Sequence, residues 1–317
     1  MPDGKWIDGL HPEMPIAEAA RLVLAARFSV VQEHLAPAAE TPYADREYVH
    51  QLRVGTRRAK AALEVFRDDL SKKVQKKAKA VLRTIRKAAG TARDWDVFVE
   101  SLESARPLQD AAGKPTLDFL LGYALGERSA AQAELVDAFE EVNSQLLELG
   151  PAITEHIREP HDKSFGELAE DQLHLDMDEF HRAVEADPHE PAELHKLRIL
   201  GKHLRYSIEI FAPCFDASLK EHLYPAVEAL QEQLGELQDA VVGIERLEGL
   251  RSMAQQMISQ EWPRIRQGFT KLLQGLRTKL RTGQKRFQTW KKNWERLIRE
   301  YPLELVKEHQ KTGEPAA

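Results

Sequence analysis

The side chains with the most chemical potential lie on two segments that repeat each other. Residues 49–66 read VHQLRVGTRRAKAALEVF, and residues 194–211 read LHKLRILGKHLRYSIEIF. On a helix, at about 100° per residue, each segment has an apolar stripe and, beside it, a row of His, Arg and Lys. We call these rows the two ladders. They consist of His50, Arg53, Arg57 and Lys60 in the first segment and His195, Arg198, Lys202 and Arg205 in the second.

The chemistry that suits such a ladder is the binding of a polyanion. Like charges at helical spacing repel each other, and Glu64 and Glu209 can neutralise only part of each ladder. Arg offers a forked set of donors to phosphate oxygens, and Lys offers a mobile point charge. The alternative is that the cations pair with acidic helices inside the fold. We expect a surplus of cations, which predicts a site for phosphate-rich ligands.

Further cationic residues follow the first ladder, and the charge of the chain is segregated. Residues 49–93 contain 14 Lys and Arg against 3 Asp and Glu, and residues 262–292 contain 10 and none. Residues 127–193 contain 19 acids and 4 bases, and the whole chain has a net charge of −6. One face of the helix after the first ladder carries Lys72, Lys76, Lys79, Arg83, Arg86 and Arg93. Arg281 and Lys285 share one side of the last long helix.

The repeat extends beyond the ladders at a constant offset of 145 residues, which places Gly90 on Gly235 and Asp94 on Asp239. Such a repeat predicts two related helical modules, residues 1–155 and 156–303, followed by a flexible tail, 304–317. The basic row of residues 72–93 is not repeated, because Lys76 and Arg83 fall on Glu221 and Glu228. We therefore expect an asymmetric site in which residues 49–93 make most of the contacts with the ligand.

The elements that position these residues are predicted to be helices throughout. Apolar residues recur at a spacing near 3.6, and alternating patterns are scarce. The expected helices cover residues 14–36, 46–68, 71–91, 94–105, 115–149, 166–186, 190–212, 216–237, 239–259 and 262–299. The single Cys214, the lack of a signal peptide and the lack of a long apolar run predict a cytoplasmic protein without a membrane span.

Other classes of function fit the sequence less well. A single-strand nucleic-acid site needs aromatic platforms, and Phe66 is the only aromatic residue between 49 and 93. A phosphate-binding GxxxxGK[ST] loop is absent from the sequence. His50 and His195 would give a metal too few ligands beside opposing cations, so we expect no metal and no cofactor. A regulator or enzyme of polyphosphate metabolism, a nucleic-acid-binding protein and a scaffold built on residues 127–193 are the alternatives.

The two ladder segments, with ARDWDVF at 92–98 and LGELQDAVV at 234–242, resemble the CHAD family, the conserved histidine α-helical domain. The resemblance covers roughly residues 15–300. It implies an all-α fold of two four-helix bundles related by a pseudo-twofold axis, with a basic surface or channel between them. It also implies non-catalytic binding of inorganic polyphosphate and an association with polyphosphate granules. The Glu-x-Glu-x-Lys mark of the triphosphate tunnel enzymes often fused to this family does not occur in the chain.

The resemblance also assigns residues to the polyphosphate site. It adds Arg58, Lys196 and His203 to the ladders and to the basic row of residues 72–86. His203 stands where Lys or Arg is more usual, so that it could weaken the grip or make it depend on pH. Gly55 replaces a common Ala.

Overall fold

The computed structural model describes residues 5–42, 44–155, 157 and 163–305, and in these ranges the chain is all-α, without a sheet. The eight long helices are α1 (Ile16–Glu40), α2 (Glu47–Val65), α3 (Lys72–Glu103), α4 (Lys114–Glu155), α5 (Phe165–Glu185), α6 (Pro191–Phe211), α7 (Tyr224–Met257) and α8 (Trp262–Glu300). Short turns of helix add η1 (Arg106–Leu108), η2 (Ala212–Cys214) and the π-helical η3 (Leu219–Leu223). Most of the expected tail, from residue 306 onward, lies outside the described residues.

Two of the predicted breaks between helices are wrong. Residues 71–91 and 94–105 belong to the single helix α3, and residues 239–259 continue the helix that begins at Tyr224. Neither junction contains proline, and Gly90 and Gly235 are tolerated inside the helices because tertiary packing offsets their low propensity. The long α3 carries the basic row and Asp94 on one rigid element.

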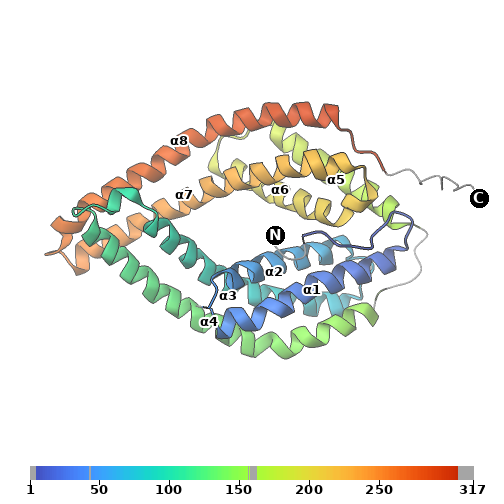
Figure 1. The fold of residues 1–317 in the computed structure, drawn as a ribbon, viewed down its shortest axis with the longest axis horizontal. Helices are drawn as coiled ribbons and strands as arrows, with labels where there is room; N and C mark the ends of the chain where they lie inside the picture. Colours follow the sequence, from blue (N-terminus) through green and yellow to red (C-terminus); the bar gives the residue numbers. More distant parts are fainter. Residues whose placement is uncertain (1–4, 43, 156, 158–162, 306–317) are drawn as a thin grey trace, which may run out of the picture.

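Within each half, each helix packs against its neighbours in chain order. α1 contacts α2 and α4, α2 contacts α3, and α3 contacts α4; in the second half α5 contacts α6, α6 contacts α7, and α7 contacts α8. Figure 1 shows the first four helices on one side of an elongated molecule and the last four on the other, with α4 and α8 along the outer edges. The halves also meet directly, because α2 packs against α6, α1 against α5 and α4 against α8.

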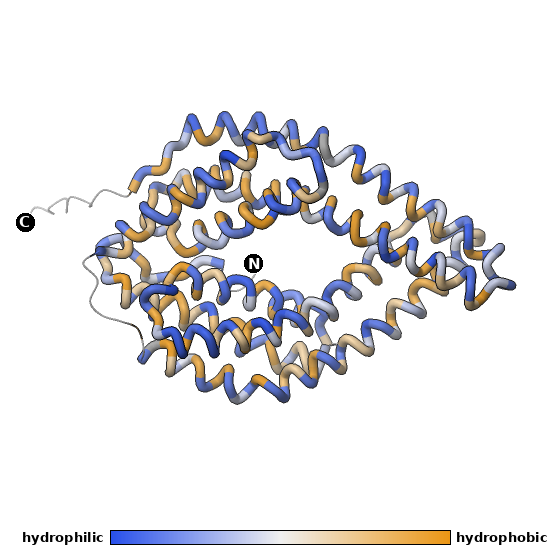
Figure 2. The backbone as a smooth tube through the Cα atoms, turned by 180° about the vertical axis from the view of Figure 1, so that it is seen from behind, coloured by the Kyte–Doolittle hydropathy of each residue, from blue (hydrophilic) through white to orange (hydrophobic). Residues whose placement is uncertain are grey.

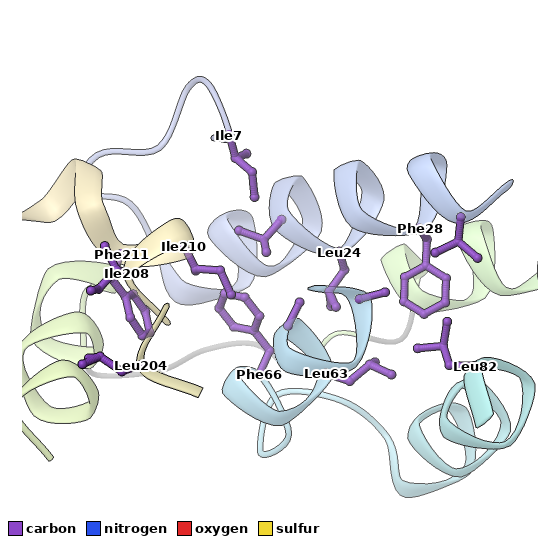
Figure 3. Packing of buried hydrophobic residues seen from close by; sticks show 14 of the residues in the cluster. Ile7, Leu24, Phe28, Leu63, Phe66, Leu82, Leu204, Ile208, Ile210 and Phe211 are labelled. Atoms are coloured by element: carbon purple, nitrogen blue, oxygen red, sulfur yellow. The ribbon is translucent and has the colours of Figure 1, made fainter. Parts of the chain in front are cut away.

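Apolar side chains account for this arrangement. Hydrophobic and hydrophilic residues alternate along every helix, as the 3.6-residue spacing predicts (Figure 2). Phe66 of α2 stacks on Phe165 at 6.4 Å between ring centroids, and Phe165 contacts Phe211 of α6 at 5.6 Å. Figure 3 shows the buried side chains of α1, α2 and α6 in this core. A separate cluster around Phe98 and Phe269 holds together the far ends of α3, α4, α7 and α8.

A buried ion pair fixes α2 against α6. Glu209 is 1% exposed, and its carboxylate accepts hydrogen bonds from Nε and Nη2 of Arg58 at 2.6 and 3.2 Å. The hydroxyl of Tyr224 donates to it at 2.8 Å, and Nη2 of Arg27 lies 3.7 Å away. The structure therefore corrects the placement of Arg58 on the ligand surface, because this side chain is 4% exposed and serves the interior.

We expect Glu209→Gln to lower the free energy of unfolding by about 3–5 kcal/mol, since it leaves the buried charge of Arg58 without its counter-charge. The matched control is Glu64→Gln, 145 residues earlier, because Glu64 is partly exposed and pairs with Lys79. Its loss should cost about 1 kcal/mol or less. Unfolding in denaturant, followed by circular dichroism, measures both, and equal effects would contradict the role given to Glu209.

Candidate polyanion-binding site

The two ladders meet where α2 packs against α6, and their cations act on one another. Burial lowers the pKa of Arg57; Tyr206 opposes this shift, and the charges of Arg53 and Arg198 add to it. Burial also lowers the pKa of Arg198, which Asp239 raises and Arg53 lowers. We call the cations of α2 and α6 that act on one another the cation cluster. It consists of Arg53, Arg57, Arg198, Lys202 and Arg205.

The pKa of Lys202 is lowered by its surroundings. Burial and then the four arginines lower its pKa to about 7, from an ordinary value of 10.5. Desolvation, as the larger cause, and the like charges of the arginines both disfavour the protonated amine. A lysine in this setting gains its proton readily when an anion arrives.

Asp94 of α3 and Asp239 of α7 act as counter-charges to two arginines of the cluster. Arg53 donates through Nη1 to Oδ1 of Asp94 at 2.5 Å and to the carbonyl of Gly90 at 3.0 Å. Asp239 raises the pKa of Arg198, opposing the effect of burial. The sequence shows that Asp94 and Asp239 occupy repeated positions, but it did not predict that they act as counter-charges.

Two arginines of the cluster have donors that no described residue accepts. Nε of Arg198 and Nε of Arg205 are buried and have no hydrogen-bond partner among the described residues, and Nε of Arg205 lies 3.7 Å from Glu209. A buried donor left unpaired costs free energy, so these two arginines are held at some cost.

Tyr206 is a site residue that the sequence analysis did not include. It is 7% exposed, it opposes the lowering of the pKa of Arg57 that burial causes, and the guanidinium of Arg205 lies 5.0 Å from its ring centroid. Its position next to Arg205 in the chain was the available signal. Tyr206 contacts Arg205 and offers no exposed face on which a base could stack.

The histidines and the remaining lysines of the ladders lie around the cluster. His50 is half-buried, and burial lowers its pKa, with Glu47 opposing and Arg93, Arg57 and Arg53 adding to the shift. His195 is exposed, and its Nδ1 donates to Oε1 of Gln238 at 3.2 Å. Lys60 and Lys196 are exposed.

His203 has a protein partner instead of an open position in the cluster. Its Nδ1 lies 3.2 Å from Oδ1 of the buried Asp176, which also accepts a hydrogen bond of 2.5 Å from Ser207. The hydrogen bond to Asp176 raises the pKa of His203, although burial opposes it. This contact ties His203 to α5, so the structure places it apart from the residues that act on Lys202.

The basic row of α3 is mostly open to solvent. Lys72, Lys76, Arg83 and Arg86 are exposed, whereas Lys79 pairs with Glu64 at 3.1 Å and Arg93 with Glu100 at 2.9 Å. On α8, Arg281 and Lys285 are exposed, while their neighbours Arg277 and Arg286 form ion pairs with Glu248 and Glu236 of α7. The main packing partner of α8 is α7, which separates these two residues from the cluster between α2 and α6.

Other kinds of site find little support in the described part of the chain. No group of three or more His, Cys, Asp or Glu side chains that could hold a metal ion occurs among the described residues. Burial raises the pKa of the Cys214 thiol to about 12, so the thiol stays protonated at neutral pH. Within the described ranges, no helix has the length and hydropathy needed to cross a membrane.

Comparison with known proteins agrees with the fold. No curated protein matches the chain. The crystal structure of the CHAD domain from the plant Ricinus communis is similar, with a TM-score of 0.67, 22% identity, and coverage of 94% of this chain and 96% of that one. PptA from Streptomyces chartreusis is similar, with a TM-score of 0.68, 15% identity, and coverage of 89% and 99%. The CHAD domain family itself matches residues 22–248, and the chain therefore belongs to the CHAD family.

Proposed function

We propose that the chain binds inorganic polyphosphate without catalysing its turnover, and that the cation cluster between α2 and α6 is the centre of the site. The observation that carries the proposal is that five cations of α2 and α6 come together where these helices pack, close enough for the four arginines to act on Lys202. A cluster of this kind repels itself until an anion arrives, and phosphate oxygens can take bidentate hydrogen bonds from Arg. Membership of the CHAD family, which is associated with polyphosphate, supports the same ligand.

The rest of the proposed site extends from this centre. We propose that His50, Lys60, His195 and Lys196 border it and that the exposed cations of α3 lengthen the track along one helix. Arg58 is left out because it is buried against Glu209, and His203 because it is bound to Asp176. Arg281 and Lys285 keep only an outlying role, for a polymer long enough to reach α8. Association with polyphosphate granules in the cytoplasm stays a prediction.

Nucleic acid is the competing polyanion, and the surroundings of the cluster favour polyphosphate. Tyr206 is buried and engaged with arginines, so it does not act as a stacking platform. The groups that face the cluster are cations that can hold phosphate oxygens but cannot read bases. A polymer made only of phosphates satisfies all of them.

We also propose that residues 1–155 and 156–303 are two modules related by a pseudo-twofold axis, with the cluster on that axis. Contacts at the 145-residue offset support this. Arg53 reaches Gly90 and Asp94, and Arg198 lies 3.8 Å from the Cβ position of Gly235 and is acted on by Asp239. The equivalents of Arg58 and Glu209 at the offset are His203 and Glu64; the pKa of His203 is raised first by Asp176 and only to a small extent by Glu64.

Charge reversal in the cluster tests the proposal. Arg53→Glu with Arg57→Glu should weaken binding of long-chain polyphosphate at least tenfold. It should also lower the slope of log K against log salt concentration by about 0.7 for each phosphate that the variant no longer neutralises. The matched control reverses Arg296 and Arg299, two exposed arginines of α8, with the same change in net charge.

Titrations with labelled polyphosphate, single-stranded DNA and duplex DNA at several salt concentrations provide the measurement. The control should bind polyphosphate within about twofold of the unmodified chain, because it leaves the cluster intact. Equal decreases in affinity in the two double variants would show that only net charge matters. Equal or tighter binding to either DNA would exclude polyphosphate as the preferred ligand.

The pKa of Lys202 predicts that binding depends on pH. In the free protein this pKa is about 7, and a bound polyanion raises it, so binding takes up a proton at pH values between the two. Affinity should therefore fall as pH rises above neutrality, by up to about tenfold per pH unit from this residue. His50, with a pKa lowered from 6.5, contributes in a more acidic range.

The control for this effect is Lys202→Arg, which keeps the charge and removes the titration. Its affinity for long-chain polyphosphate should stay nearly constant from neutral to mildly alkaline pH. Long chains are used because their terminal phosphates, which titrate near neutrality, are few. A pH dependence that is the same in Lys202→Arg and in the unmodified chain would contradict the assignment.

A further inference from the structure

A cavity of about 390 Å³ lies between α6, α7 and α8. Its walls are mostly apolar and are formed by Leu194, Leu234, Leu237, Val241, Leu280 and Phe287. Leu234 and Phe287, each 2% exposed, form its deepest part, and the exposed Ala192 and His195 stand at its mouth. The volume falls within the range of cavities that hold small molecules.

Arg198 supplies the positive charge of this cavity. It forms part of the lining, and its Nε is buried and has no hydrogen-bond partner among the described residues. The net effect is a lowered pKa of Arg198, because burial lowers this pKa by more than the charge of Asp239 raises it. His195 is held near it by the hydrogen bond from Nδ1 to Gln238. The cavity therefore combines mostly apolar walls with the guanidinium of one arginine.

The corresponding residues of the first half are closely packed, and small side chains explain why. At the 145-residue offset, Leu234 and Leu237 correspond to Ala89 and Ala92, both 0% exposed in the tight packing of α3 against α4. Val241 corresponds to Asp96, which is buried and bound to Arg128 at 2.6 Å. The cavity therefore lies at positions whose residues the second half does not share with the first.

We propose that this cavity binds a monocarboxylate with an apolar body, whose carboxylate lies on Arg198 and whose hydrocarbon part lies between α7 and α8. Charge complementarity selects this ligand, since a guanidinium binds a carboxylate through parallel hydrogen bonds and the walls offer the body mostly apolar contacts. Arg198 is the one Arg or Lys among the described lining residues, which suits one negative charge. The ligand would enter past Ala192 and His195.

A series of straight-chain carboxylates from hexanoate to decanoate tests the proposal by calorimetry on the full chain. Affinity should rise about fourfold with each methylene that enters the cavity and then level off once the cavity is full. The amine and the alcohol of the same length should bind at least tenfold more weakly than the carboxylate, because neither carries a negative charge for Arg198. A flat series, or an amine that binds as well as the carboxylate, would overturn the proposal.

Two neighbouring residues of α7 give a matched pair of variants. Val241→Phe fills the cavity and should weaken decanoate binding at least tenfold, whereas Val242→Phe places the same side chain at a position 39% exposed and should leave binding within about twofold. Ala192→Trp at the exposed mouth should weaken binding by the same factor without disturbing the core. Unchanged binding in both Val241→Phe and Ala192→Trp would show that decanoate binds elsewhere.

Arg198 belongs both to this cavity and to the cation cluster, so the two ligands should compete. Decanoate should weaken polyphosphate binding by the same factor by which polyphosphate weakens decanoate binding. This consequence rests on the proposed function, whereas the carboxylate series does not. If decanoate binds as described and polyphosphate does not bind, the proposed function fails and the cavity assignment stands; if the reverse is found, the cavity assignment fails alone.

Discussion

The buried carboxylate of Glu209 is the group on which the arrangement of the cationic helices depends. It lies on α6, it receives Nε and Nη2 of Arg58 from α2, and it accepts the hydroxyl of Tyr224 from the start of α7. A buried charge pair of this kind is weak evidence for stability but fixes one arrangement, because a slip of either helix would leave an unpaired charge in the core. Fixed in this way, α2 and α6 hold their ladders face to face.

Holding the ladders together has an electrostatic cost that the protein only partly offsets. Asp94 takes part of the charge of Arg53, and Asp239 acts on Arg198. Burial and then the four arginines lower the pKa of Lys202 to about 7, so like charges add to the cost of desolvation there. The apolar stripes of the same helices, with Leu52, Leu63 and Leu204 fully buried, supply the opposing stabilisation. An anionic ligand would offset the repulsion between these cations.

The sequence predicted the helical fold and the ladders because both follow from periodicity, which is a local property. It did not predict which cations form long-range ion pairs inside the protein and which remain available to a ligand. Arg58 was assigned to the ligand through the resemblance alone, although it follows Arg57 by about 100° around the helix and so points to another face. Its partner Glu209 is 151 residues away, and only the packing of α2 on α6 brings them together. The cavity beside Arg198 likewise depends on how α6, α7 and α8 pack together, which no local pattern contains.

Repeated positions serve different purposes in the two halves, and this difference makes the molecule asymmetric. Where α3 presents Lys79 and Arg83 near its surface, the residues at the offset are Tyr224, bound to Glu209, and Glu228, bound to Lys5. Arg86 is exposed, and its counterpart Gln231 is buried. Tyr224 and Gln231 thus belong to the interior, where Tyr224 holds the anchoring carboxylate, while Glu228 replaces a cation with an acid. The same positions therefore carry cations at the surface of the first half and packing or acidic residues in the second.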